Sequence, residues 1–431
     1  SLTRRSGRGR HPGGALYGAA LRVGQVVLRL LFLPWEAWVN LSAACTALWR
    51  MLISRRRLLQ WQTSAQSGSG GAFSTVRAAW PCIALGLALL ILSPYPAGKA
   101  LGIVWLAAPV FALSLGRECG REAVPAAGER RFLMDECAKI WAYFDEFCTA
   151  GRGYLPPDNW QEQPPVGVAE RTSPTNIGLG MVSALAALDL GLTTLDRAAE
   201  IVGGMLDTCE RLDKWRGHLY NWYDTRTLKP LSPAYVSTVD SGNLAASLTA
   251  LAAGLREYGC HELAGRASAL AQGMDFAALY DRRRRLFRIG YDAAQDALSE
   301  GCYDLMASEA RLTGYYAVAS GAVSARHWRQ LSRALVSRDG YRGLASWTGT
   351  MFEYLMPELF LPLQRGSLLW ESARFCLYVQ RRDVPEGAPW GQSESAFFSL
   401  DAALAYRYKA HGCAALALQR GMGTDTVCAP Y

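Results

Sequence analysis

The sequence predicts an all-α protein, a toroid of paired helices preceded by helices that lie on or cross a membrane. From about residue 130, Ala and Leu recur at helical spacing in one segment after another, and the connections hold the Pro, Gly and acidic residues. Before that point the chain is mostly apolar. In the whole sequence, half of the residues are hydrophobic and only 19% are charged. This balance is apolar for a purely soluble protein and indicates that part of the chain meets lipid.

The chain divides into four predicted parts. They are a disordered basic segment, interfacial or membrane-proximal helices, a transmembrane hairpin and a helical domain, at residues 1–20, 21–65, 78–116 and 130–431. In the second part, Arg22, Arg29 and Glu36 recur every seven positions and keep one polar stripe on an apolar helix. Pro34 is expected to interrupt that helix. An ordinary pair of buried helices is the alternative.

The predicted hairpin consists of two apolar runs, 78–92 and 100–115, around a turn that contains Pro94, Pro96 and Lys99. Each run is shorter than the roughly 20 residues of a comfortable span, so a re-entrant or buried hairpin is the alternative to two short spans. Arginines lie before and after the hairpin, and its turn holds a single lysine. By the positive-inside rule both ends face the cytoplasm, which also places the helical domain there.

Composition argues against several kinds of chemistry. The eleven cysteines form no Cys-x-x-Cys pair and the five histidines no His-x-x-x-His pair, so we expect no disulfide framework, no metal site and no cofactor. The sequence has no Gly-x4-Gly-Lys loop, no Gly-x-Ser-x-Gly elbow and no Asp-x-Asp pair. Much of the net charge of +8 comes from arginines before the helical domain. That placement suits a membrane surface better than a nucleic acid, and no nucleic-acid partner is expected.

Helices are expected in the domain at residues 131–149, 176–190, 194–212, 241–258, 262–278, 304–319, 325–336, 347–353, 366–380 and 395–408. Their connections are rich in Trp, Tyr, Asn and carboxylates. Sugars offer apolar faces that stack on aromatic rings and hydroxyls that bind carboxylates and amides, so these loops predict an oligosaccharide cleft. The alternative is that the aromatic residues fill a large core.

Glycosyl transfer requires two carboxyl groups that flank the reacting bond. Loop and helix-start carboxylates supply the candidates, which are Asp158, Asp224, Asp240, Asp304, Glu309, Glu353 and Glu394. Residue type and spacing do not choose among them. Glu309 could be a solvated helix residue paired with an arginine, and Glu394 a carboxylate favoured at a helix N-terminus.

Six motifs closely resemble those of the bacterial cyclic β-1,2-glucan synthases, and the similarity extends over residues 15–431. They are Arg171-Thr-Ser-Pro-Thr-Asn-Ile-Gly178, Arg216-Gly-His-Leu-Tyr-Asn-Trp-Tyr-Asp-Thr-Arg-Thr-Leu228, Val239-Asp-Ser-Gly-Asn-Leu-Ala245, Tyr303-Asp-Leu-Met-Ala-Ser-Glu-Ala-Arg-Leu312, Met351-Phe-Glu-Tyr-Leu-Met-Pro357 and Trp390-Gly-Gln-Ser-Glu-Ser-Ala396. The resemblance implies the middle, glucoamylase-like part of a large bacterial inner-membrane protein, with its preceding membrane segments. A glycosyltransferase region and a phosphorylase-like region of the same polypeptide would be its partners, together with β-1,2-glucan and the lipid bilayer.

The resemblance further implies an (α/α)6 fold and the cyclisation of linear β-1,2-glucan by anomer-retaining transglycosylation. It maps one motif glutamate to Glu309, which we assign as general acid/base, and another to Glu394, which we assign as nucleophile. Glu353 and Asp240 are rivals for these roles. Substrate binding is expected from other residues of the motifs and loops, namely Arg171, Asn176, Tyr220, Asn221, Trp222, Tyr223, Asp224, Asp240, Asn243, Tyr303, Asp304, Trp347, Glu353, Tyr354 and Trp390.

Two other functions fit the same residues. A water-accessible acceptor side would make the domain an endo-β-1,2-glucanase, and a cleft without catalysis would make it a module that holds glucan for the other regions. A retaining mechanism predicts carboxyl groups about 5–5.5 Å apart, whereas an inverting hydrolase needs roughly 6.5–9.5 Å.

Overall fold

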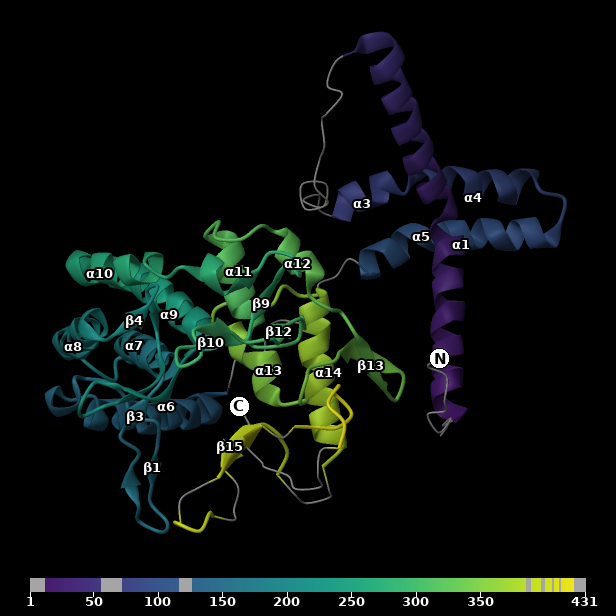
Figure 1. The fold of residues 1–431 in the computed structure, drawn as a ribbon. Coiled ribbons are helices and arrows are strands. Elements are labelled where there is room, and N and C mark those ends of the chain that lie inside the picture. The colour runs from purple at the N-terminus through teal and green to yellow at the C-terminus, as the bar shows by residue number, and fades with distance from the viewer. Residues whose placement is uncertain are drawn as a thin grey trace. The chain divides into compact units, whose positions relative to one another are not determined.

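The computed structural model describes residues 12–55, 72–115, 126–384, 389–396, 400–404, 407–410 and 412–421 (Figure 1). The chain forms two compact units that divide between Pro125 and Ala126. Residues 1–11 of the segment expected to be disordered lie outside the described residues, as do residues 56–65 of the second predicted part.

The first unit consists of helices. They are α1 (Pro12–Trp49), a π-helical turn (Arg50–Ser54), α3 (Ala72–Ala78), α4 (Trp80–Leu92) and α5 (Pro96–Leu115). Helix α1 already begins at Pro12, within the segment predicted to be disordered, because the apolar helical pattern extends back to Ala15. Two helical stretches, Val23–Ser54 and Pro96–Ser114, are long and apolar enough to cross a membrane.

Helices α4 and α5 pack as a hairpin with their backbones in direct contact. A Cβ atom added to Gly86 would lie 2.9 Å from the carbonyl oxygen of Gly102, and one added to Gly102 would lie 2.7 Å from that of Gly86. Only glycine fits both positions, since either added atom would clash with backbone. Such small-residue contacts are typical of helices that associate in membranes.

The prediction that Pro34 interrupts the first helix is wrong, because α1 continues through it. Proline has no N–H to donate to the carbonyl four residues earlier, which here belongs to Leu30. The indole N–H of Trp105 on α5 donates to that oxygen instead, at 2.9 Å. Since the orphaned acceptor has a partner on a neighbouring helix, the backbone keeps its helical course.

The described chain is mostly helical, which confirms the predicted fold class, and helices are the main elements of the second unit. Its helices are α6 (Ala127–Phe147), α7 (Pro174–Asp189), α8 (Leu195–Arg211), α9 (Thr238–Glu257), α10 (His261–Gln272), α11 (Arg311–Ala319), α12 (Arg326–Gln330), α13 (Met351–Leu355) and α14 (Leu368–Arg382), with 3-10 turns at Ala150–Arg152, Phe276–Leu279 and Met356–Leu359. Helix α9 packs against α7, α10 and α11, while α8 packs against α7 and α10. Successive helices thus pack in pairs, as expected for the predicted toroid of paired helices.

Many connections that the sequence predicts as loops are short antiparallel strands. A five-stranded sheet has the order β11 (Ala297–Leu298), β10 (Gly290–Asp292), β7 (Pro230–Ser237), β6 (Asn221–Asp224) and β3 (Arg171–Thr172). A second sheet has the order β12 (Cys302–Tyr303), β9 (Leu286–Arg288) and β8 (Tyr280–Asp281). The paired strands are β1 (Trp160–Gln161) with β2 (Gly167–Val168), β4 (Lys214–Trp215) with β5 (His218–Leu219), β13 (Leu335–Arg338) with β14 (Tyr341–Leu344), and β15 (Glu394–Ala396) with β16 (Tyr408–Ala410).

Several helix predictions are wrong in part or in full. The helix expected over 262–278 ends at Gln272, and the one expected over 347–353 begins only at Met351. The helix expected over 304–319 begins only at Arg311, and the one over 325–336 ends at Gln330. Strands β13 and β14 follow, joined by Asp339 and Gly340 with φ of 51° and 81°, a tight hairpin turn that an Asp-Gly pair favours. Where a helix is expected over 395–408, the described residues form β15 and β16, and some of the others lie outside the described residues.

Two close contacts hold α9 against its neighbours α11 and α7. A Cβ atom on Gly242 of α9 would lie 1.9 Å from the Thr313 hydroxyl of α11, and one on Gly178 of α7 would lie 2.8 Å from the Ser247 hydroxyl of α9. The helices therefore approach more closely than bulkier residues would allow.

Two large hydrophobic cores lie within the described residues of this unit, along with a small cluster of Ala246, Leu312 and Met356. One includes Ile177, Leu248 and Ala317, and the other Met306, Phe375 and Leu416. The chain between Met306 and Ala317 passes from the second core to the first, and Glu309 lies on this segment.

Candidate active site

Glu309 lies just before α11, and its carbonyl oxygen accepts the N–H of Leu312 at 3.0 Å. The residue is half-buried. Burial raises the pKa of its carboxyl well above the usual range, and the carboxylates of Asp240, Glu394 and Glu353 raise it further, while a hydrogen bond with Asn243 lowers it. A carboxyl group in these surroundings holds its proton to a higher pH than a free glutamate does, which suits a proton donor.

Glu394 lies on β15, and Tyr408 of the paired strand β16 donates its hydroxyl to Oε2 of Glu394. Burial raises the pKa of the Glu394 carboxyl and nearby Glu353 adds to this, but hydrogen bonds from Tyr408 and Thr350 lower it. The two glutamates thus lie in one cluster of like charges with different partners. The pKa of each carboxyl is raised, and the hydrogen bonds from Tyr408 and Thr350 oppose this rise at Glu394.

Asp240 and Asn243 extend the cluster from the first turns of α9. The hydroxyl of Thr175 on α7 donates to Oδ1 of Asp240 at 2.7 Å, and the side-chain N–H of Asn243 donates to the same hydroxyl at 3.1 Å. Asn243 is buried, and its Oδ1 has no partner within the described protein. Helices α7 and α9 therefore fix a carboxylate and an open amide oxygen beside Glu309.

Tyr303 of β12 belongs to the same cluster. Burial raises the pKa of its hydroxyl, and so do the charges of Glu309, Asp240 and Glu394. The hydroxyl consequently stays protonated and is available as a hydrogen-bond donor among carboxylates.

Glu353 is near these groups, but its carboxylate is saturated with donors. It accepts hydrogen bonds from the backbone N–H of Trp347, Thr348 and Thr350 and from the hydroxyls of Ser346, Thr348 and Thr350, at 2.8–3.3 Å. It is buried on α13 and closes a capping box with Thr350. A carboxylate held in this way orders the 346–350 loop and is poorly placed to move a proton or attack a sugar.

A second group of predicted residues lies together on β3, β6 and α7. The guanidinium of Arg171 lies 5.2 Å from the Trp222 ring and bonds to Asp158 at 2.8 Å. Asn176 donates to the other oxygen of Asp158 at 3.4 Å. A half-buried tryptophan with fixed polar neighbours is the kind of surface on which a sugar ring stacks.

Several residues predicted to bind substrate belong neither to the carboxylate cluster nor to the group around Trp222. Tyr223 and Tyr354 are fully buried core residues whose hydroxyls donate to the backbone carbonyls of Asp213 and Leu344, so neither side chain is open to a ligand. Asp304 and Trp347 are exposed, and Trp390 lies beside Arg381 at 5.6 Å. Tyr220, just before β6, and Asn221, on β6, are half-buried, and Oδ1 of Asn221 has no partner among the described residues.

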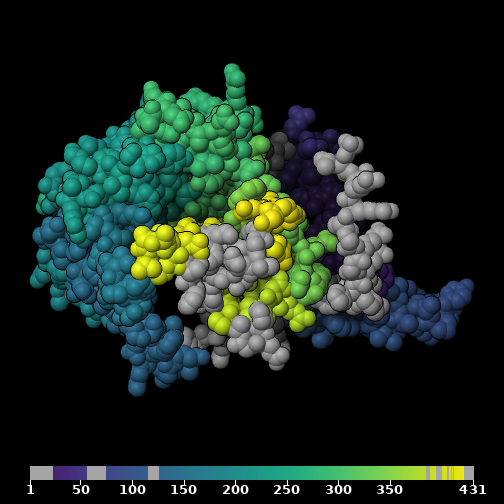
Figure 2. Space-filling model, turned by 60° about the horizontal axis from the view of Figure 1, so that its bottom comes forward, coloured from purple at the N-terminus to yellow at the C-terminus, as the bar shows by residue number. Residues whose placement is uncertain are grey.

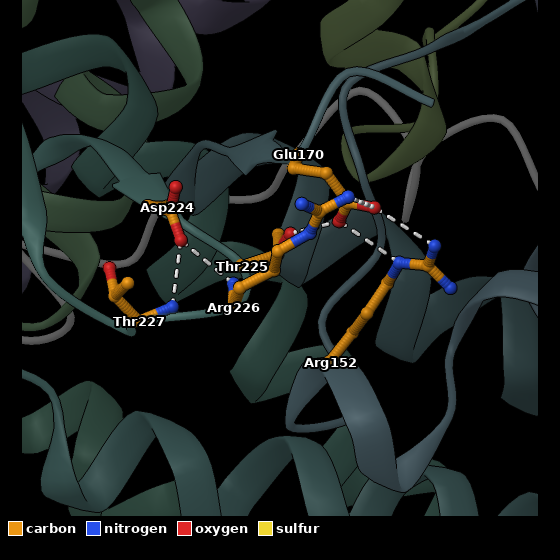
Figure 3. A network of polar contacts seen from close by, with 6 residues as sticks. All are labelled: Arg152, Glu170, Asp224, Thr225, Arg226 and Thr227. Carbon is orange, nitrogen blue, oxygen red and sulfur yellow. Dashed lines mark hydrogen bonds and ion pairs between the residues drawn. The ribbon is translucent and has the colours of Figure 1, made fainter. Parts of the chain in front are cut away.

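Asp224 holds a turn and forms no part of the carboxylate cluster. Its Oδ1 accepts the backbone N–H groups of Arg226 and Thr227 at 2.9 and 2.7 Å (Figure 3). These hydrogen bonds, that of Thr227 first, lower the pKa of Asp224. The sequence analysis gives Asp224 as a candidate catalytic carboxylate, but its hydrogen bonds point to a structural role in this turn.

Glu170 joins the same region from the residue before β3. It accepts from Arg152 at 2.9 and 3.0 Å, from the Thr225 hydroxyl at 2.7 Å and from Arg226 at 3.1 Å (Figure 3). The hydrogen bond from Arg152, followed by those from Thr225 and Arg226, lowers the pKa of Glu170 to about 2, against the opposing effect of burial. This network anchors the end of β6 to the start of β3.

Residues near the C-terminal end of the described chain pack beside its beginning in this unit. The side chain of Gln161 on β1 donates to the carbonyl oxygens of Pro164 at 3.2 Å and of Leu404 at 2.8 Å. Figure 2 shows the yellow C-terminal segment against the blue segment of the same unit. Leu404, in the segment that follows the strand of Glu394, is thus held by a hydrogen bond from β1, near the start of the second unit.

Sequence reasoning missed Tyr408, Thr175 and the ion pair of Arg311 with Glu358. Tyr408 falls within a segment predicted as helix, and the partners of Thr175 are visible only in three dimensions. Arg311 is buried and also donates to the carbonyl of Tyr354 at 2.9 Å, which anchors the segment after Glu309 to α13. The capping-box spacing from Thr350 to Glu353 is a sequence signal that identifies Glu353 as structural.

A cavity of about 870 Å³ lies elsewhere, between α9, α10 and α11, and its lining contains no carboxylate. It therefore cannot supply an acid/base pair. Within the described parts of the chain, no three His, Cys, Asp or Glu side chains converge to hold a metal ion.

The chain is similar in sequence to the cyclic β-(1,2)-glucan synthase NdvB of Rhizobium meliloti (strain 1021). The two are 31% identical over an alignment of 549 positions that covers 94% of this chain and 19% of NdvB, so the chain spans about a fifth of that relative. No protein-family model matches the chain.

Two solved structures resemble the second unit. One is an endo-β-1,2-glucanase of Talaromyces funiculosus in complex with sophorose, with a TM-score of 0.55, 14% identity and coverage of 67% of this chain and 70% of that one. The other is a predicted glucoamylase of Bacteroides caccae, with a TM-score of 0.54, 18% identity and coverage of 65% and 75%. At these identities the likeness shows the fold. The second unit therefore has the glucoamylase-like (α/α)6 fold, and over nearly all of its length the chain is related to the cyclic β-1,2-glucan synthases.

Proposed function

We propose that this chain cyclises linear β-1,2-glucan by anomer-retaining intramolecular transglycosylation, as part of a longer cyclic β-1,2-glucan synthase. The observation that carries the proposal is the pairing of Glu309, whose pKa is raised well above its usual range, with Glu394, which accepts the Tyr408 hydroxyl. The name of the related synthase supports the ring-forming reaction, and its likeness extends through the segments that hold both glutamates.

In the first step, the carboxylate of Glu394 attacks the anomeric carbon of an internal glucosyl unit. The glycosidic bond breaks, and Glu309 gives its proton to the departing 2-oxygen. The glucan on the non-reducing side remains bound to Glu394 as a glycosyl ester. Glu309 is then ionised.

In the second step, the 2-hydroxyl at the non-reducing end of the bound glucan attacks the same anomeric carbon. Glu309 takes the hydroxyl proton, the ester bond to Glu394 breaks and the ring closes. Two inversions give net retention. Thr175 orients Asp240 beside Glu309, and Trp222 with Arg171 would hold a glucosyl unit near the acceptor position.

The decisive experiment compares E309Q and E394Q in the full-length synthase, with linear β-1,2-glucan as substrate and mass spectrometry of the products. Each change is expected to lower the cyclisation rate by roughly a hundredfold or more. The exposed Glu300 provides the matched control, because E300Q removes the same charge outside the cluster. Unimpaired cyclisation by E309Q and E394Q would leave a glucan-holding role, and linear products with new reducing ends would identify a hydrolase.

We also infer that the first unit anchors the chain in a bacterial inner membrane, with the second unit in the cytoplasm. The two long apolar helices and the glycine contact between α4 and α5 support this proposal. Proteolysis of intact spheroplasts and of inverted vesicles tests it. The second unit is expected to be cleaved only in inverted vesicles, and cleavage in intact spheroplasts would reverse the orientation.

A further inference from the structure

Five exposed arginines gather where the turn between β8 and β9 meets α12, and we call them the arginine face. They are Arg282, Arg283, Arg285, Arg326 and Arg329. His327 joins the two elements, because its Nδ1 lies 3.1 Å from the carbonyl oxygen of Arg285 and its ring packs edge-on against Phe287 at 5.1 Å. Since His327 is itself buried, α12 is held firmly beside the turn.

The charge of the arginine face is not neutralised by the protein around it. Among the described residues, none of its five side chains forms an ion pair. Asp281, the acidic residue of the same turn, bonds to Arg288 at 2.7 Å, and its Oδ1 accepts the backbone N–H groups of Arg283 and Arg284. Five clustered cations that gain nothing from intramolecular pairing are available to an external anion.

We propose that the arginine face docks on anionic phospholipid headgroups of the membrane that holds the first unit. This inference rests on the membrane attachment proposed above and is independent of the chemistry of Glu309 and Glu394. Residues 116–125 join α5 to the second unit, and ten residues span at most roughly 35 Å. The tether therefore keeps the second unit near the lipid surface, where each arginine strengthens binding about fivefold.

Nucleic acid would offer phosphates to the same arginines, but nothing holds it near the protein, whereas the tether confines lipid headgroups within reach. The test uses the full chain in lipid nanodiscs made of phosphatidylcholine alone or mixed with phosphatidylglycerol. Phenylglyoxal modifies accessible guanidinium groups, and mass spectrometry gives the rate at each arginine. We expect phosphatidylglycerol to slow modification of the arginine face about fivefold or more and high salt to restore it.

Two exposed arginines outside the face, Arg211 and Arg342, are internal controls and are expected to react at the same rate in both discs. Equal slowing at the controls, or no slowing at the face, would overturn the proposal. A chain that does not enter the discs would overturn the membrane attachment and this inference with it. Loss of cyclisation alone has no bearing on either.

The variant R282Q/R283Q/R326Q/R329Q leaves Arg285 as the reporter, and the same four positions changed to lysine provide the matched control. In the glutamine variant Arg285 is expected to react equally in both discs, whereas in the lysine variant phosphatidylglycerol still protects it. Protection retained in the glutamine variant contradicts lipid docking. Protection of the face by an added oligonucleotide, without any response to phosphatidylglycerol, would assign it to nucleic acid instead.

Discussion

At the scale of single residues, three glutamates of the candidate site have three different environments. Glu309 is surrounded by carboxylates, Glu394 accepts a tyrosine hydroxyl, and Glu353 is saturated with hydrogen-bond donors. The capping-box spacing from Thr350 marks Glu353, but spacing does not single out Glu309 and Glu394, because the groups around these two come from distant segments. The family motifs separate Glu309 and Glu394 from the other carboxylates, and their surroundings support the assigned roles.

The charge of Asp240 is expected to set the pH range of the reaction. D240N removes a carboxylate that raises the pKa of Glu309, so Glu309 will lose its proton at lower pH. The active form has Glu309 protonated, and therefore the alkaline limb of the kcat/KM profile should move to lower pH. T175V, which removes a hydrogen bond but keeps the charge, is the control and should move the limb less. An unmoved limb in D240N would contradict the assignment of Glu309 as the acid.

Glu353 is expected to matter for stability. In E353Q, one of the two buried acceptor oxygens becomes an NH2 group, which cannot accept the hydrogen bonds made there. The free energy of unfolding should fall by about 2–3 kcal/mol. Urea denaturation of the variant measures the loss, with E300Q as the exposed control. If E353Q abolished cyclisation without lowering stability, Glu353 would have a catalytic role after all.

At the scale of elements, local sequence signals predict the boundaries of helices better than they predict the strands. Ser173 caps α7 and Pro174 begins it, and both are visible in the sequence. The strands are short, and their pairing depends on partners far along the chain, as β15 pairs with β16 across residues 397–407. The Asp339-Gly340 turn is the exception, since its dipeptide predicts a hairpin.

The Glu170 network is expected to stabilise the pairing of β3 with β6 in a pH-dependent way. The pKa of the Glu170 carboxyl is lowered from the ordinary 4.5 to about 2. The stabilisation by its hydrogen bonds and ion pairs is therefore complete above pH 4.5 and is lost as the pH falls toward 2. E170Q should therefore unfold more easily at neutral pH by about 1–2 kcal/mol, allowing for partial solvent screening. Denaturation at both ends of this range measures it. A difference that persists at pH 2 would show that charge is not the cause.

Trp105 is expected to keep α1 continuous at Pro34. W105F retains an aromatic ring but leaves the carbonyl oxygen of Leu30 without a donor, which should cost about 1–2 kcal/mol. Thermal unfolding in detergent compares it with W80F, which removes an indole packed against Trp38 and frees no carbonyl oxygen. Equal losses in the two variants would show that the hydrogen bond contributes nothing.

At the scale of the whole molecule, the fold class follows from apolar periodicity, because helical spacing recurs along most of the chain. The candidate site does not follow from it. Its carboxylates come from α9, the segment before α11, α13 and β15, and only packing contacts such as Gly242 against Thr313 bring them together. The arginine face likewise combines a turn with a later helix, so the sequence alone shows only its first half.

The order of these segments also affects how the protein is made. The first core and Glu309 leave the ribosome well before Glu394 and its partner Tyr408. Until the segment with Glu394 is translated, Glu309 lacks one of the three carboxylates that raise its pKa, and the proposed nucleophile is absent. Under the proposed mechanism, a nascent chain that lacks Glu394 would not cut or join glucan, and the proposed activity would begin only after residues 394–408 have been translated.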